Sequence, residues 1–369
     1  TYCTVRCMGR RQGSGKRLCL LLCAVAGCIF CIAACTVLAM KQFKKIVLLC
    51  FGVGSVAAAI YFRSNIKPRP PNSMLETDTL SAATLYLPPD TAQIQQSAQA
   101  ALIRYGRELI INTRKYLGPA GMVTQVSNQL NCQSCHLEAG AKASAYSANF
   151  LGVAANYPLY RDRSGMMETI QFRVNDCMLR SMNGKPLDTA GREMKALVAY
   201  ILWVGKDIPA KIKPVNSKIE QLAYLQRAAD TISGKKVYAV KCQLCHGANG
   251  NGGYSVDSAL YYPPLWGAGS YNTGAGMYRL SRLAGFVKNN MPFGVSHGKS
   301  QLSNEECWDV AAFINSKPRP HKVFPNDWPD LRKKAIDHPF GPYADSFSEQ
   351  QHKYGPFGPI ENERKKKLN

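Results

Sequence analysis

The sequence is poor in two things, acidic residues and runs of alternating apolar and polar residues. Asp and Glu number 24 against 46 Lys and Arg, which gives a formal net charge of +22. Such a basic chain suits an anionic partner, whether nucleic acid, an anionic membrane or a small anion. No nucleic-acid recognition motif accompanies the charge, so we expect no nucleic-acid partner. The near absence of strand patterns predicts an all-α fold.

The length of the chain sets the expected number of domains. Its 369 residues are too many for one compact domain and enough for two of ordinary size with extensions. Apolar residues at helical spacing predict helices over 92–116 and 191–203, which open and close a first domain. Helices over 219–240 and 304–315 do the same for a second. This repetition indicates an internal duplication.

The first 65 residues lie outside both predicted domains. An uncharged run over 18–39 is long enough to cross a bilayer, and a shorter apolar run over 46–62 follows three lysines. The second run is typical of an export signal that starts at Met40, and a retained anchor helix is the alternative because no A-x-A cleavage site follows closely. We interpret residues 1–39 as an upstream extension of the gene model or a further hydrophobic segment. The protein is expected in the periplasm, cleaved or anchored to the inner membrane.

Composition sets the remaining boundaries. Residues 66–89 and 211–218 contain proline and little periodicity, which is typical of linkers. The residues after 318 are rich in Pro, Gly and aromatic side chains, so we expect an irregular tail that wraps over the domains, with its terminal lysines in solvent. The predicted segments are 1–39, the signal or anchor 40–65, linker 66–89, domain one 90–210, linker 211–218, domain two 219–318 and tail 319–369.

Two copies of the motif C-x-x-C-H stand in the chain, one in each predicted domain. At this spacing two thiols can each form a thioether to a haem vinyl group, and the next residue directs its imidazole to the iron. A zinc site is the main alternative, but neither copy is followed by a second ligand pair at zinc-finger spacing. We therefore predict two covalently bound c-type haems. They are attached through Cys132, Cys135, Cys242 and Cys245, and their irons are bound by His136 and His246.

The ligand on the opposite face of each haem decides between electron transfer and chemistry. In the second domain Met291 lies 45 residues past His246, a position suited to closing that face. A thioether is a neutral, soft ligand that raises the reduction potential. We predict Met291 as the ligand. The alternative is that Met291 is only a core side chain and that Met277, or nothing, fills the site.

In the first domain the corresponding distance leads to a cysteine. Cys177 lies 41 residues past His136, and a thiolate on iron stabilises the ferric state and lowers the potential. Such a site suits sulfur chemistry or bond formation rather than simple relay. Two alternatives stay open: a disulfide between Cys177 and Cys307, or Met178 or Met182 as the ligand. Cys307 lies on the apolar stripe of a predicted helix, which favours packing in the core.

Several short segments between about residues 90 and 360 match one family. They are Asn175-Asp-Cys177, Arg180-Ser-Met-Asn-Gly184, the second haem motif, Gly274-Ala-Gly-Met277 and Asn290-Met-Pro292. Together they resemble the dihaem thiosulfate dehydrogenases, which are tetrathionate-forming cytochromes c. The haem motifs alone are unspecific, whereas the Asn-Asp-Cys segment at this distance is specific.

The resemblance implies roles for several residues. Cys177 would be the distal ligand of the first, catalytic haem, and Met291 that of the second. Some members of the family carry Lys before the Met and exchange ligands, but Asn290 stands here, so no exchange is expected. The family's substrate-binding groups fall on Arg163, Arg173 and Ser181.

The charge of the chain suits this chemistry. Joining two thiosulfate dianions brings like charges together, so the pocket must be cationic. We expect arginines 161, 163, 173 and 180, which stand near Cys177 in the sequence, to crowd the approach to it. Two electrons leave per tetrathionate, and two one-electron haems hold both. The resemblance implies an enzyme that passes electrons from the first haem through the second to an acceptor cytochrome c or oxidase. Tetrathionate reduction is the reverse alternative. A non-catalytic, membrane-tethered dihaem electron carrier is another, and it predicts Met178 or Met182 on the iron.

Overall fold

The structure is a computed structural model that describes residues 85–368. Both apolar runs expected near the amino terminus, and most of the first linker, lie outside these residues. The described residues group into one compact unit. Within the described range, no helix combines the length and the apolarity that a bilayer crossing requires.

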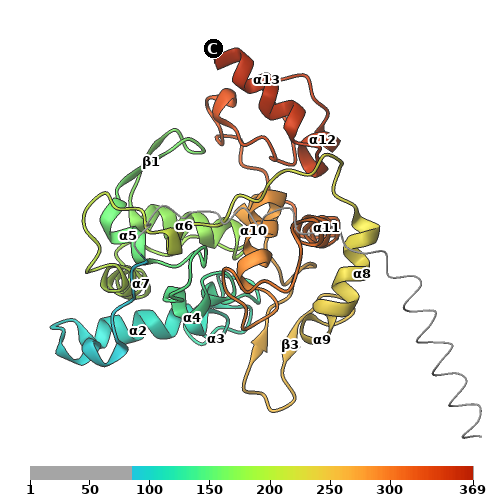
Figure 1. The fold of residues 1–369 in the computed structure, drawn as a ribbon. Coiled ribbons are helices and arrows are strands. Elements are labelled where there is room, and N and C mark those ends of the chain that lie inside the picture. Colours follow the sequence, from blue (N-terminus) through green and yellow to red (C-terminus); the bar gives the residue numbers. More distant parts are fainter. Residues whose placement is uncertain (1–84, 369) are drawn as a thin grey trace, which may run out of the picture. The chain divides into compact units, whose positions relative to one another are not determined.

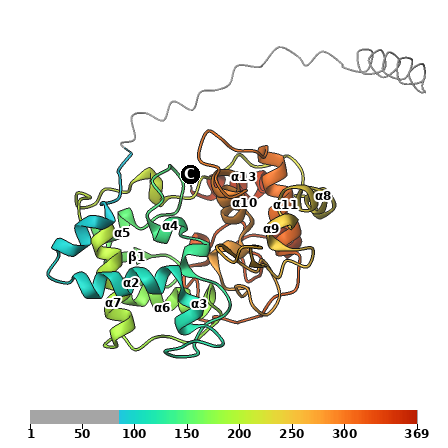
Figure 2. The same ribbon diagram turned by 90° about the horizontal axis from the view of Figure 1, so that it is seen from below.

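The first helical group consists of the elements between residues 91 and 204. Figures 1 and 2 show it in blue to green beside the yellow-to-orange second group. Its only strands in the described chain form one antiparallel hairpin, with Leu159 opposite Glu168. The elements are the 3₁₀ helix Thr91–Gln96, α2 (Ala100–Ile111), α3 (Thr113–Leu117), the 3₁₀ turn Cys132–Ser134, α4 (Leu137–Gly140), α5 (Leu151–Asn156), β1 (Leu159–Arg161), β2 (Met166–Glu168), α6 (Ile170–Arg180) and α7 (Arg192–Val204).

The second helical group and the tail follow. A second antiparallel hairpin pairs Gly253 with Tyr262. The elements are the 3₁₀ turn Val215–Ser217, α8 (Thr231–Lys241), α9 (Gln243–His246), β3 (Gly253–Tyr254), β4 (Tyr261–Tyr262), the 3₁₀ turn Gly276–Tyr278, α10 (Leu280–Asn290), α11 (Asn304–Asn315), the 3₁₀ turn Leu331–Lys333, α12 (Glu349–Tyr354) and α13 (Gly358–Leu368). The regular secondary structure of the described residues is helical apart from two short hairpins, which confirms the predicted fold class.

In each group the first long helix packs closely against the last one, and a glycine permits the contact. A Cβ atom on Gly106 of α2 would lie 2.0 Å from the carbonyl oxygen of Ala196 in α7. A Cβ atom on Gly234 of α8 would lie 1.9 Å from the carbonyl oxygen of Asp309 in α11. No side chain fits at either position without moving a backbone. The two groups therefore share one packing solution, as an internal duplication requires.

The two closing helices agree with the sequence-based prediction. The predicted ranges 191–203 and 304–315 correspond to α7 and α11. Met194, Leu197 and Ile201 form the buried stripe of α7, whereas the apolar Leu202 is 42% exposed. Leu202 follows Ile201 directly and points about 100° further around the helix axis. Helix α11 begins with a capping box between Ser303 and Glu306, whose side chains bond each other's backbone N–H groups.

The opening helix of the second group is shorter than predicted. Only Thr231–Lys241 is helical, because the Asp230 side chain accepts the N–H groups of Ile232 and Ser233 and starts the helix there. Residues 219–230 are not helical. This stretch packs against α11, because Trp308 Nε1 of that helix donates to the Ala223 carbonyl oxygen at 3.0 Å.

The tail packs over the second group, as predicted from its aromatic content. Phe357 and Ile360 are 3% and 0% exposed and belong to the second hydrophobic core. Lysines 365–367 are exposed. The tail is not wholly irregular, however, because it ends in α12 and α13. Ion pairs one turn apart support α13, at 3.1 Å between Lys365 and Glu361 and 2.6 Å between Lys367 and Glu363.

Candidate active site

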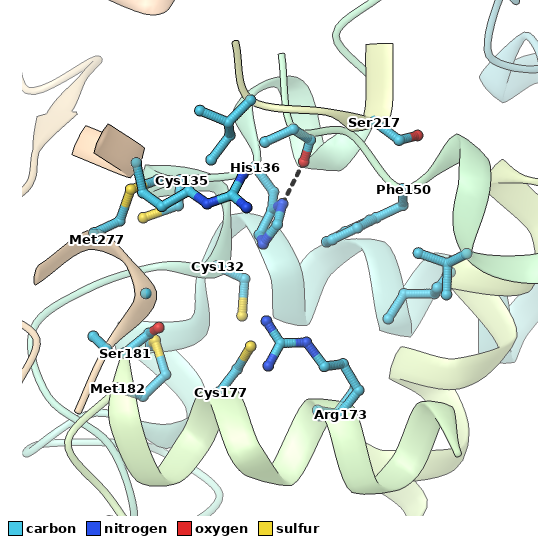
Figure 3. Close-up of a pocket in the computed structure, with 18 of the residues that line it drawn as sticks. Cys132, Cys135, His136, Phe150, Arg173, Cys177, Ser181, Met182, Ser217 and Met277 are labelled. Carbon is cyan, nitrogen blue, oxygen red and sulfur yellow. Dashed lines mark hydrogen bonds between the residues drawn. The ribbon is translucent and has the colours of Figure 1, made fainter. Parts of the chain in front are cut away.

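A cavity of about 800 Å³ lies beside the first haem motif and is lined mainly by the first helical group, with further residues from the second group and the tail. Figure 3 shows His136 and Cys177 projecting into it from opposite sides, with Cys132 between them in this view. Much of the wall is apolar, which suits a large planar cofactor that is withdrawn from water. The apolar lining includes Ile110, Leu117, Leu130, Phe150, Val153, Val174, Leu197 and Ile201.

Hydrogen bonds fix the first C-x-x-C-H motif to the cavity wall. Thr113 Oγ1 accepts the Cys132 N–H at 2.9 Å, and His136 Nδ1 lies 2.6 Å from the Ala148 carbonyl oxygen. A carbonyl oxygen can only accept, so Nδ1 carries the hydrogen and the Nε2 lone pair is left for a metal. Burial lowers the pKa of His136, which favours the neutral imidazole that binds iron.

The two thiols of this motif do not resemble a redox dithiol. Burial raises the pKa of Cys132 to about 11 and that of Cys135 to about 12, whereas redox C-x-x-C motifs lower it. Among residues 85–368 no group of three or more His, Cys, Asp or Glu side chains could hold a metal ion, so the zinc alternative finds no ligand set there. The apolar cavity, the paired thiols and the available Nε2 fit a covalently attached haem.

Helix α6 presents Cys177 to the cavity. Thr169 caps the helix, since its side chain accepts the Phe172 N–H at 3.2 Å. Arg173 and Cys177 are one turn apart and both point into the cavity in Figure 3. The negative charge of a Cys177 thiolate raises the pKa of Arg173, against the effect of burial. Cys177 and Cys307 are both free thiols, so the structure contradicts the disulfide alternative.

Asp176, the residue before Cys177, gathers three arginines. Its Oδ2 accepts bonds from Arg163 and, at 2.5 Å, from Arg173, and its Oδ1 accepts one from Arg180 at 2.5 Å. Burial alone would raise the pKa of Asp176, but the three guanidinium groups lower it below its ordinary value. The carboxylate therefore stays ionised and holds the arginines in place.

Arg180 has a different position from the other arginines. It is buried, bonds Asp327 of the tail at 2.6 and 2.8 Å, and lies 3.6 Å from the Phe324 ring centroid. It is absent from the cavity lining, so its expected place near the approach to Cys177 was wrong. It ties the tail to α6 instead. The predicted residues that do line the cavity are Arg161, Arg163, Arg173, Cys177 and Ser181.

Four further cationic side chains, which the sequence did not predict, line the cavity. Arg279 is paired with the buried Asp337 at 2.5 Å, whereas Arg282, in the first turn of α10, is exposed. No Asp or Glu occurs among the described lining residues. These cations follow Cys177 by 36 to 105 residues, so no local motif marks them and the overall basic charge was the only signal. They are Lys213, Lys218, Arg279 and Arg282.

Methionines and the tail complete the wall. Met277 lines this cavity and packs against the first core, so the alternative that it binds the second haem was wrong. Met178 and Met182 are buried and line the same cavity as Cys177. Trp328 and His338 reach it from the tail, where the backbone N–H of Trp328 donates to the Arg163 carbonyl oxygen at 2.7 Å.

The second C-x-x-C-H motif has a similar arrangement. His246 is 9% exposed, and its Nδ1 lies 2.9 Å from the Pro263 carbonyl oxygen, which again leaves Nε2 for a metal. Burial lowers the pKa of His246 and raises that of Cys242 to about 11. Met291 ends α10, donates its N–H to Val287 at 3.0 Å, and packs with Cys242 against the second core.

Two helical groups, each with a C-x-x-C-H motif whose histidine is held through Nδ1, define a dihaem cytochrome c with two covalently bound haems. Two family models agree: a SoxA/TsdA cytochrome c domain matches residues 123–210, and a cytochrome c domain matches 232–317. Domains of this kind also indicate an exported protein.

The chain belongs to the thiosulfate dehydrogenase family. It is 38% identical over 255 residues to the thiosulfate dehydrogenase of Psychrobacter arcticus, a match that covers 69% of this chain and 75% of the relative. It is 34% identical over 281 residues to that of Thiomonas intermedia, covering 76% and 86%. The solved thiosulfate dehydrogenase (TsdBA) of Marichromatium purpuratum matches at 30% identity with a TM-score of 0.58, covering 70% of this chain. This chain spans only 53% of that one.

Proposed function

We propose that the protein oxidises thiosulfate to tetrathionate in the cavity of the first helical group and passes the electrons through two haems to an acceptor cytochrome c or oxidase. The observation that carries the proposal is the acid-free, cationic lining around Cys177, opposite His136. Relatives named thiosulfate dehydrogenase support it and favour an enzyme over an electron carrier. We place the activity in the periplasm, reached through a signal or retained anchor at 40–65.

The cationic lining offsets the electrostatic repulsion between the two thiosulfate dianions that must react. Two dianions about 4 Å apart repel four times as strongly as a unit pair, or by roughly 16 kcal/mol at an effective dielectric constant of about 20. Guanidinium groups around the cavity offset this repulsion and bind sulfonate oxygens through two N–H groups at once. Asp176 holds Arg163 and Arg173 in place from behind, because it is buried and does not line the cavity.

The residues around the first motif have separate tasks. The bound haems supply two one-electron acceptors. We propose that His136 and Cys177 would hold the iron of the first haem, and His246 and Met291 that of the second. Arg163, Arg173 and Ser181 bind the anions, and all three line the cavity.

Cys177 is also the proposed nucleophile. Its thiolate and one thiosulfate would form a sulfur–sulfur bond with the loss of two electrons, for which two bound haems would be the one-electron acceptors. The terminal sulfur of a second thiosulfate would then attack the thiosulfate sulfur that is bonded to Cys177. This attack would displace the Cys177 thiolate. Two thiosulfate ions thus give one tetrathionate and two electrons, without proton transfer, and the Cys177 thiolate is regenerated.

The test compares the haem-loaded wild type with Cys177→Met. The wild type should reduce ferricyanide with thiosulfate, and the variant should keep both haems, lose the thiolate signature in its EPR spectrum and lose activity by roughly 10³-fold or more. Mass spectrometry of substrate-treated protein should find added sulfur on Cys177 and none on the buried Cys307. Cys307→Ala is the control and should keep both activity and EPR spectrum. A wild type that does not respond to thiosulfate would leave the electron-carrier alternative.

A further inference from the structure

Lys142 is a buried lysine in the loop that follows the first haem motif. It is 8% exposed, and its Nζ donates to the Val295 carbonyl oxygen at 2.8 Å and to Asn290 Oδ1 at 3.0 Å. The Asn289 carbonyl oxygen lies 3.5 Å away. All three acceptors are neutral oxygens, and all belong to the second helical group. A buried ammonium group surrounded by such oxygens keeps its charge only while they stay in place.

The segment that Lys142 binds carries Met291. Asn290 comes directly before Met291 and Val295 four residues after it, so the ammonium group holds the chain on both sides of the methionine. The first helical group holds Asn290 at a second point, since its Nδ2 donates to the Tyr146 carbonyl oxygen at 3.1 Å. Two contacts across the boundary between the groups therefore restrain this segment.

The loop that makes these contacts is itself fixed. The Lys142 carbonyl oxygen accepts bonds from Ser147 Oγ at 2.8 Å and Asn149 Nδ2 at 2.9 Å. The same loop includes Ala148, whose carbonyl oxygen holds His136 Nδ1. One short loop thus contacts the histidine of the first site and the methionine segment of the second.

We propose that Lys142 is a positioning residue for the second haem, holding Met291 from the first helical group in the place where it binds iron. The inference rests on the proposed role of Met291 as a ligand. An iron–thioether bond forms only when the sulfur is held in one position. If the segment is loosened, the bond is therefore present in a smaller fraction of the molecules. Loss of the thioether lowers the reduction potential of the second haem. Removal of a buried cation from the vicinity acts in the same direction, because a positive charge favours the reduced state.

The test is Lys142→Met in the haem-loaded protein, since methionine keeps an unbranched apolar stem and removes the ammonium group. The measurements are the far-red absorption band of the ferric iron–thioether bond, the reduction potentials of both haems, and thermal unfolding. We expect the band to weaken and the potential of the second haem to fall, with the first haem's EPR spectrum unchanged. Asn290→Ala removes one acceptor with a smaller change in volume and should act in the same direction. If Lys142→Met does not fold, Asn290→Ala serves as the test variant in its place.

Two controls separate the possible failures. Lys195→Met, at an exposed position of α7, should leave the band and both potentials at wild-type values. Met291→Ala should abolish the band, and if it does not, the ligand assignment is wrong whatever Lys142 does. If Met291→Ala abolishes the band while Lys142→Met and Asn290→Ala keep its intensity and the potential, Lys142 does not position the ligand. A lower unfolding temperature with both signals intact would show a purely structural tie and would also overturn the inference.

Discussion

Replacement of Asp176 by Asn removes the carboxylate that three arginines share beside Cys177. Arg180 keeps its two bonds to Asp327, so Arg163 and Arg173 are the cations left without their carboxylate partner. Loss of one partner of a buried ion pair costs about 3–5 kcal/mol, because the remaining charge stays buried. Asn keeps one acceptor oxygen and Arg173 is one-third exposed, so we expect the lower end, about 3 kcal/mol.

The pH dependence of this loss follows from the lowered pKa of Asp176. A carboxylate whose pKa is lower in the folded protein stabilises it above the unfolded pKa of about 3.9, and this contribution disappears as the pH falls through the folded value. Urea unfolding of the haem-loaded protein, followed by circular dichroism, measures the difference between variant and wild type. The difference should be full near pH 7 and should shrink once the pH falls below about 4.

The control for this experiment is Asp162→Asn. Asp162 pairs with Lys333 at 3.2 Å, and both side chains are half exposed, so this change should cost less than about 1 kcal/mol. Equal costs for the two variants near pH 7, or a cost of Asp176→Asn that persists unchanged in acid, would refute the reasoning.

Three further outcomes follow from the packing and charge of the structure. Gly106→Ala places a Cβ 2.0 Å from a carbonyl oxygen of α7 and should cost about 1–3 kcal/mol in thermal unfolding, while Gly358→Ala, which meets nothing within 4 Å, should be close to neutral. Arg282→Gln should raise KM for thiosulfate about 10-fold with a smaller change in kcat. Replacement of the exposed Arg332 by Gln is the control and should change neither constant. An unaltered KM for Arg282→Gln would exclude a binding role for Arg282. Raising the ionic strength from about 0.01 to 0.15 M shortens the Debye length from about 30 to 8 Å and should raise the wild-type KM more than that of Arg282→Gln, in steady-state assays at matched pH.

The sequence alone determined the features that depend on neighbouring residues. The C-x-x-C-H spacing is a local property of the chain, so both haem motifs could be identified without coordinates. The closing helices were also predictable, because a buried stripe repeats every three to four residues within one helix. The helix predicted over 219–240 forms only from Thr231, because Asp230 caps this later start and Trp308 binds the preceding segment at Ala223. That competition depends on packing against another helix.

Tertiary structure decided which distant residues share the cavity. Arg282, Met277 and Trp328 come from beyond the second haem motif yet line the cavity of the first, while Arg180, close to Cys177 in sequence, turns away to Asp327. The bond between Lys142 and Asn290 joins residues 148 positions apart. Helical periodicity and motif spacing describe one element at a time, whereas these contacts arise when two helical groups and the tail pack together. The sequence therefore predicts the cofactor, whereas only the folded chain shows which charged side chains line the cavity.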